Sequence, residues 1–127
     1  MAQEDKELLI KDLCARLDTN LVCSIYRTDD EGVGYRDEIL HGYCKGDTWY
    51  EFYFREDCSI SIDNVSKIKP YLFPLSSITK KRLEELSEYI DIKNAYVAVD
   101  FFNSHHIDYR GLIEKGLAID STNLNIY

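Results

Sequence analysis

The stretch FFNSHHIDYRGLIEKGLAID, residues Phe101 to Asp120, has the most specific local pattern in the chain. It predicts the end of one helix, a corner, and a second short helix. Asp108 takes the N-cap position, where its carboxylate can accept hydrogen bonds from the free N–H groups of the first turn. Gly116 takes the position that follows the helix, so that Leu117 falls against Leu112 in a Schellman ending. We therefore expect this stretch to organise the C-terminal part of the fold.

The size and charge of the chain limit its classes of function. Its 127 residues suit one domain, expected to span residues 1–127, and its 23 acidic and 15 basic residues give a net charge of −8. Nucleic-acid binding normally needs a basic surface, so it is disfavoured. Four cysteines without zinc-ligand spacing predict buried thiols in a reducing compartment. The N-terminus shows no signal peptide and the chain no membrane span, which together predict a cytoplasmic protein.

The N-terminal half predicts one helix followed by a sheet. Residues 4–17 carry apolar side chains at helical spacing, with Asp12 and Arg16 among the charged residues off the apolar face. Residues 21–26, 35–44, 47–54 and 58–62 then read as four mainly antiparallel strands. The acidic, glycine-containing segment between the first two strands predicts a hairpin loop.

The C-terminal half predicts helices. Residues 63–75 look irregular, and within them residues 68–75, with Pro70 and Pro74, are expected to form an extended segment that crosses the core. A helix capped by Ser77 or Thr79 should reach Ile90, a second should cover residues 95–106, and the third is the short helix after Asp108. Residues 121–127 read as a tail or an edge segment. The fold class expected is α+β: an N-terminal helix, a four-stranded mainly antiparallel sheet, a crossing segment and three C-terminal helices.

The third predicted strand has aromatic residues on both faces. Tyr50, Phe52 and Phe54 share one face, and Trp49, Glu51 and Tyr53 share the other. Aromatic residues suit the core of a protein interface and acidic residues suit its rim. The candidate partner surface is therefore the face that carries Tyr35, Trp49, Glu51 and Tyr53.

The corner around His105 is the one concentrated group of catalytic residue types. His105 and His106 point about 100° apart on a helix, so they can share a site only if the helix breaks between them. A nucleophile is missing from the local pattern. Arg110 suits a structural pair with Asp100 or Glu114, or alternatively an anion clamp. The candidate ligand corner comprises His105, His106, Tyr109 and Arg110.

A small basic patch opens the helix that follows the crossing segment. Lys80, Lys81 and Arg82 lie in its first turn, where cations oppose the helix dipole. A solvated face is the simpler interpretation, and an anion or nucleic-acid contact is the functional one. No residue pattern predicts a metal site or a cofactor-binding loop.

Three segments of the chain resemble a known family. The chain is similar to a family of short uncharacterised proteins from prophages and mobile elements of gut anaerobic bacteria in residues 11–17 (KDLCARL), residues 68–79 (IKPYLFPLSSIT) and residues 100–120, which contain HHIDYRGLIEKGLAID. The resemblance covers about a third of the chain. It implies a bacterial or phage cytoplasmic setting and supplies no catalytic residue.

These observations favour a non-enzymatic accessory protein of a phage or mobile element that binds another protein. The alternative is a nucleic-acid-associated regulator that uses Lys80, Lys81 and Arg82. A weaker alternative is a small hydrolase or transferase at His105 or His106, which would need both histidines to converge with a thiol or carboxylate in a cleft.

Overall fold

The chain folds as α+β, in agreement with the sequence. The computed structural model describes residues 1–29, 32–45, 50–54, 58–81, 84 and 95–127. Its elements are, in order, helix α1 (Gln3–Ala15), strands β1 (Val22–Asp29), β2 (Gly32–Lys45), β3 (Tyr50–Phe54) and β4 (Cys58–Ser61), 3-10 helix η1 (Ile62–Lys67), strand β5 (Ile68–Pro74), 3-10 helix η2 (Leu75–Ser77), helix α3 (Ala95–Ser104), and strands β6 (Ile107–Asp108) and β7 (Ile119–Asp120).

The sheet is mixed and has seven strands in the order β4-β3-β2-β1-β5-β6, with β7 also paired to β5. The pairs among β1 to β4, and β1 with β5, are antiparallel. The short strands β6 and β7 run parallel to β5. The four strands predicted from sequence are therefore present as β1 to β4, but the expectation of a four-stranded sheet is wrong.

The three additional strands depend on contacts that are distant in sequence. The predicted crossing segment is extended, as its prolines indicate, yet it also pairs with β1 through Ile68, Lys69 and Pro70. Proline lacks an N–H donor and so argues against a paired strand when only the sequence is read. Strands β6 and β7 are two residues long, too short to leave a sequence pattern.

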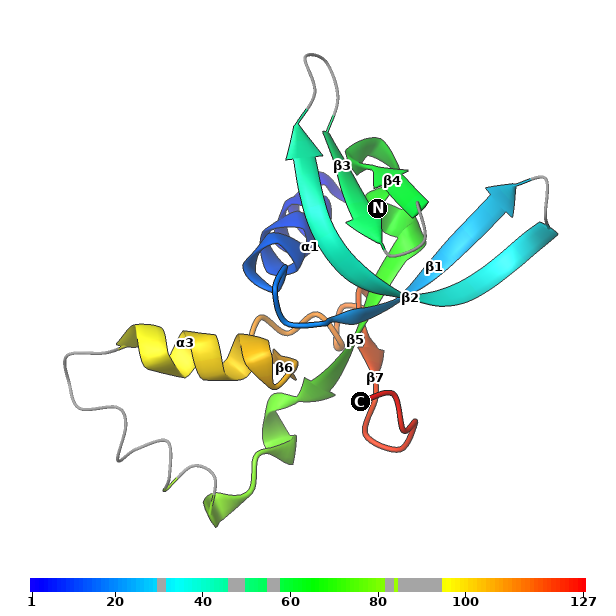
Figure 1. Cartoon of the computed structure of the whole chain (residues 1–127). Helices are drawn as coiled ribbons and strands as arrows, with labels where there is room; N and C mark the ends of the chain where they lie inside the picture. The colour runs from blue at the N-terminus through cyan, green and yellow to red at the C-terminus, as the bar shows by residue number, and fades with distance from the viewer. Residues whose placement is uncertain (30–31, 46–49, 55–57, 82–83, 85–94) are drawn as a thin grey trace.

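Strand β2 bends between two different partners (Figure 1). Its first part, residues 32–39, pairs with β1, and its second part, from Leu40 onward, pairs with β3 after a register shift at His41. The outer part of the β1–β2 hairpin, residues 26–29 and 32–35, consequently projects from the body of the molecule (Figure 1). We call this part the ribbon.

The core lies between α1, the inner face of the sheet and the C-terminal turn. Leu9 and Leu13 of α1 are fully buried, as the helical spacing predicts. Phe52 and Phe54 point into the same core, which confirms the predicted alternation of β3. The remaining members come from all parts of the chain: Leu21, Cys23, Ile25, Leu40, Cys58, Ile60, Val65, Ile68, Leu72, Leu112, Leu117 and Ala118.

The C-terminal helices differ from the prediction. Helix α3 confirms the one expected over residues 95–106. The helix expected from Ser77 or Thr79 to Ile90 lies largely outside the described residues, although Lys80 and Lys81 are helical. The short helix after Asp108 is wrong, because those residues form only a turn. No helix in the described part of the chain is long and apolar enough to cross a membrane.

Gly111 explains why the third helix is missing. Its φ of +73° lies in the left-handed region, so the helical path cannot begin before Leu112. Asp108 still accepts from two backbone N–H groups, those of Leu112 and Ile113, both at 2.9 Å. Asp108 therefore caps one isolated turn and not the first turn of a helix.

The predicted ending of that turn is confirmed. Gly116 has a φ of +72°, and its N–H donates to the carbonyl of Ile113 at 3.0 Å. The N–H of Leu117 donates to the carbonyl of Leu112 at 2.9 Å. These two bonds are the pair that defines a Schellman motif.

Candidate functional site

The corner after α3 separates the four residues of the predicted ligand corner. Helix α3 ends at Ser104, and His106 has a φ of +58°, so the chain leaves the helix between the two histidines. His105 and His106 could face one site only if the helix ended between them, and the structure has this break. Both histidines line one cavity, whereas Tyr109 and Arg110 face α1.

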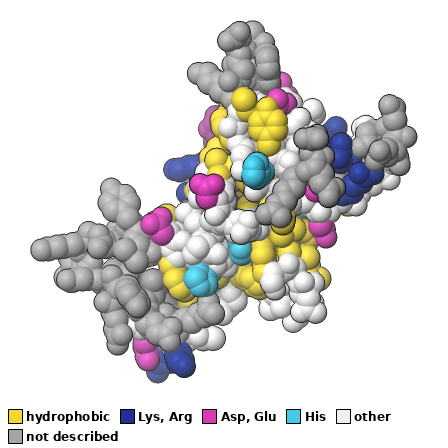
Figure 2. Space-filling view, in the orientation of Figure 1, with side chains coloured by type: hydrophobic (Ala, Val, Ile, Leu, Met, Phe, Trp, Pro, Cys, Tyr) yellow, Lys and Arg dark blue, Asp and Glu magenta, His cyan; other side chains and the backbone are white. Residues whose placement is uncertain are grey.

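The cavity lies between the end of α3, the end of β5 and the C-terminal segment, and its volume is about 560 Å³. That volume falls in the range of about 300–1,000 Å³ that is usual for small-molecule sites. Figure 2 shows histidine side chains flanked by hydrophobic ones in this region. The lining residues are Phe73, Ser77, Ile78, Thr79, Phe101, Ser104, His105, His106, Ile107, Thr122 and Tyr127.

Two stacked pairs of rings form part of the cavity wall. The ring of His105 lies on Phe101, with centroids 4.1 Å apart and planes at 19°. The ring of His106 lies on Tyr127, with centroids 3.8 Å apart and planes at 12°. Aromatic and histidine rings therefore make up a large part of the cavity wall.

Tyr127 holds the C-terminal segment in place. Its hydroxyl donates to the carbonyl of Tyr71 at 2.7 Å and accepts from the N–H of Val22 at 3.0 Å. Burial raises the pKa of this phenol above its usual value. The last residues are consequently part of the cavity wall, a role that their sequence pattern did not indicate.

His106 is a neutral, buried residue. It is 8% exposed, and its Nδ1 has no hydrogen-bond partner among the described residues. Burial lowers its pKa to about 4, and the positive charge of Arg16 and the neighbouring His105 add to the effect. At neutral pH the imidazole is therefore uncharged.

The geometry gives little support to catalysis at the corner. The Ser104 hydroxyl donates to the carbonyl of Phe101 at 3.1 Å, and His105 Nδ1 lies 3.1 Å from both that oxygen and the hydroxyl. Among the described residues that line the cavity there is no thiol and no carboxylate. A hydrolase or transferase at this corner would need both histidines to meet a thiol or a carboxylate in the cavity. Of these groups, only the two histidines are present among the described lining residues.

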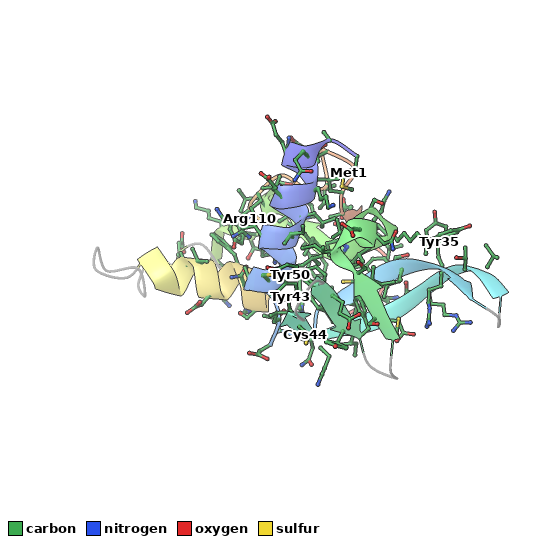
Figure 3. The ribbon with its side chains drawn as sticks, turned by 90° about the horizontal axis from the view of Figure 1, so that it is seen from above. Met1, Tyr35, Tyr43, Cys44, Tyr50 and Arg110 are labelled. Carbon is green, nitrogen blue, oxygen red and sulfur yellow. The ribbon has the colours of Figure 1, made fainter. Side chains whose placement is uncertain are left out.

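Arg110 has the structural role that the sequence favoured, with a partner that it did not indicate. Its Nη1 donates to the Asp12 carboxylate at 2.8 Å, not to Asp100 or Glu114. Figure 3 shows Arg110 beside α1. Tyr109 stacks under this guanidinium, 4.5 Å from it, and its hydroxyl donates to Asn103 at 2.9 Å.

Asp12 and Arg16 are the centre of this polar cluster, and both are fully buried. Arg16 donates to Asp12 through Nε at 2.9 Å and Nη2 at 3.1 Å. Its remaining donors reach the carbonyls of Ile107 at 2.6 Å and Phe102 at 3.3 Å. The prediction that both residues lie off the buried face is wrong. The sequence did contain one indication of this ion pair: Asp12 precedes Arg16 by four residues, a spacing at which an acid and a base are neighbours on a helix.

The predicted partner surface is divided by the structure. Tyr35 is in the ribbon, opposite Tyr26, whereas Tyr53 pairs with Gly42. Seven residues along β2 separate those two positions, or about 23 Å of strand. Figure 3 shows Tyr35 far from Tyr43 and Tyr50. Trp49 lies outside the described residues.

Glu51 and Tyr53 form their own cluster on the outer face of β3. The Tyr53 hydroxyl donates to Glu51 at 3.0 Å. Hydrogen bonding to Cys44, followed by that to Glu51, raises the pKa of Tyr53 to about 12. Within the described ranges, no three His, Cys, Asp or Glu side chains gather closely enough to hold a metal ion.

The ribbon carries one exposed residue, Val33, that the sequence had assigned to a loop. Val33 is 72% exposed, and Tyr35, which was predicted to lie in a strand, is 73% exposed. The ring of Tyr26 lies 5.1 Å from that of Tyr35 on the neighbouring strand. Val33 was missed because it lies within an acidic, glycine-rich segment, where a turn is the expected structure.

The basic patch remains at the surface. Lys80 and Lys81 are exposed, and Arg82 lies outside the described residues. Lys80 follows Thr79, which lines the cavity.

No protein-family model, curated protein or solved structure matches this chain. The resemblance to prophage and mobile-element proteins therefore stays a prediction.

Proposed function

We propose that this protein is a non-enzymatic accessory protein of a phage or mobile element, that it acts in the bacterial cytoplasm by binding another protein, and that the ribbon is its contact surface. The observation that carries the proposal is the exposure of Val33 and Tyr35, at 72% and 73%, on a projecting two-stranded hairpin. Interface cores are enriched in aromatic residues of this kind. The free thiols of Cys14 and Cys23 support a reducing compartment.

The backbone of the ribbon suits addition of a partner strand. Residues 32–39 of β2 pair with β1 on one side, and β3 pairs with β2 only from Leu40 onward. In the described part of the chain, no strand pairs with the other edge of residues 32–35. Such an edge can pair with an extended peptide, which is how many protein partners are bound.

The charges along the β1–β2 hairpin are mixed. Arg27 is followed by Asp29 on β1, and Arg36 is followed by Asp37 and Glu38 on β2. The partner segment is therefore defined by an extended backbone with apolar side chains and not by its charge.

Affinity capture with two matched variants tests this proposal. Tyr35→Ala removes an exposed ring of the ribbon, and Leu124→Ala removes an exposed apolar residue, 48% exposed, in the C-terminal segment. We expect Tyr35→Ala to reduce recovery of a co-purifying protein by about tenfold or more, as for an interface hot spot. Leu124→Ala should leave recovery unchanged. Equal recovery with both variants would refute the proposal.

Sedimentation of the purified protein separates a second copy of the chain from a different partner. Edge strands can pair with an identical strand, so self-association is the main alternative. We expect a monomer for both the original chain and Tyr35→Ala. A dimer that Tyr35→Ala dissociates would assign the ribbon to self-association instead.

The exposed Lys80 and Lys81 keep a nucleic-acid-associated regulator as the second candidate. A gel-shift at low salt tests it, because phosphate contacts weaken as salt increases. A shift that is lost when Lys80, Lys81 and Arg82 are neutralised would favour this candidate over protein binding.

A further inference from the structure

We propose that the cavity between α3, β5 and the C-terminal segment binds a neutral, planar aromatic molecule of one or two fused rings. This site is separate from the ribbon and does not depend on the function proposed for it. Two properties of the cavity carry the inference: the aromatic rings in its wall and the absence of permanently charged side chains among its described lining residues.

The wall suits a flat ring. Phe101 with His105, and His106 with Tyr127, form two stacked pairs with planes within 20° of parallel, at 19° and 12°. Phe73, whose ring lies 5.9 Å from that of Tyr127, adds a further aromatic side chain. Aromatic rings gain most from offset stacking or edge contacts with another ring. An aliphatic chain would fill the same volume without using this geometry.

The described part of the lining has no permanently charged side chain, because it contains no carboxylate, ammonium or guanidinium group. His106 is neutral at physiological pH because its pKa is lowered to about 4. A charged ligand would lose its hydration against these residues without gaining an opposite charge. The described lining therefore favours a neutral ligand.

Most hydroxyl groups among the lining residues already have partners. Ser104 donates to the carbonyl of Phe101, and Thr122 donates to Asp120. The ligand is therefore recognised through its ring faces and edges and not through a set of unpaired hydroxyl groups.

Chemical-shift mapping with three probes tests the ligand class. The probes are indole, which is neutral and planar, indole-3-acetate, which is planar and anionic, and octanol, which is neutral and aliphatic. We expect indole to shift the backbone amides of residues 104–107 and of Phe73 and Thr122 in a saturable way. The other two probes should bind about tenfold more weakly or worse. Octanol that binds as well as indole, or indole that shifts none of these amides, would overturn the proposal.

Two serine variants locate the binding site. Ser77 lines this cavity, and its exposed neighbour Ser76 lines a different one. Ser77→Trp should fill the cavity and weaken indole binding by about tenfold or more, whereas Ser76→Trp should leave it unchanged. Equal effects of the two variants would overturn the assignment. Tyr35→Ala in the ribbon should retain indole binding, so failure of one proposal is distinguishable from failure of the other.

Discussion

At the scale of single residues, Asp12 connects the first helix to the C-terminal corner. Its carboxylate accepts from Arg16 at 2.9 Å and from Arg110 at 2.8 Å, and Arg16 in turn donates to the carbonyl of Ile107. Removal of one partner from a buried ion pair leaves an uncompensated charge in the interior. The stability of the corner that carries the two histidines therefore depends on a residue about 90 positions away.

Asp12→Asn should destabilise the protein strongly. We expect the free energy of unfolding to fall by about 3–5 kcal/mol, because Arg16 stays buried without an anionic partner. Urea denaturation followed by circular dichroism measures this change. Asp18→Asn, an exposed position just after α1, should change stability by less than about 0.5 kcal/mol.

A double variant separates charge from packing. Asp12→Leu combined with Arg16→Met replaces the pair with apolar side chains, which often restores stability. We expect it to be more stable than Asp12→Asn. If Asp12→Asn is as mild as Asp18→Asn, the cluster does not have the structural role described.

His106 should make stability depend on pH between about 6.5 and 4. Its pKa is lowered from 6.5 to about 4 on folding, so below pH 6.5 the unfolded chain binds a proton that the folded protein does not. Stability is therefore full above pH 6.5 and falls as the pH decreases toward 4, by up to about 3 kcal/mol. Thermal or urea unfolding across this pH range measures the slope.

His106→Asn is the matched control for this pH dependence. Asparagine tolerates the positive φ of this position and does not titrate. We expect the slope between pH 6.5 and 4 to be smaller in this variant. A slope equal to that of the original chain would assign the pH dependence to other groups.

At the scale of elements, the features read correctly from sequence are those that depend on neighbouring residues. The apolar spacing of α1, the alternation of Phe52 and Phe54 in β3, and the closure of the turn at Gly116 all follow from local geometry. The helix expected after Asp108 was wrong because Gly111 takes a left-handed conformation that its sequence neighbours do not require.

Gly116→Ala tests the turn without disturbing the packing. A Cβ at Gly116 would meet no atom within 4 Å, so the cost comes from its φ of +72° alone. We expect a loss of about 1–2 kcal/mol in the free energy of unfolding. Gly42→Ala, which also has open space but no left-handed φ, should cost less than about 0.5 kcal/mol. Equal costs would show that the left-handed conformation is not maintained.

At the scale of the whole molecule, the sequence could not show which distant segments meet. The pairing of β5 with β1, the approach of Arg110 to Asp12 and the docking of Tyr127 against Tyr71 all join residues more than 40 positions apart. Only some residues of the candidate site could therefore be predicted from the sequence. His105 and His106 were identified as unexplained residues, but the rings that complete their cavity came from other elements.

The same limit applied to the interaction surface. The aromatic residues of β2 and β3 were expected to form one face, and the bend of β2 places Tyr35 on a separate, projecting ribbon (Figure 1). Exposed apolar residues grouped on a projecting element commonly mark a binding surface. The ribbon and the cavity are thus two distinct regions of the molecule.

Site-specific photo-crosslinking from the ribbon is the most direct test of the proposed function. A photoreactive amino acid is placed at Val33, 72% exposed on the ribbon, or at Leu124, 48% exposed in the C-terminal segment, and the protein is irradiated in the cells that produce it. We expect a discrete adduct with one other protein from position 33 and none from position 124. An adduct that appears equally from both positions, or no adduct from position 33, would contradict the account.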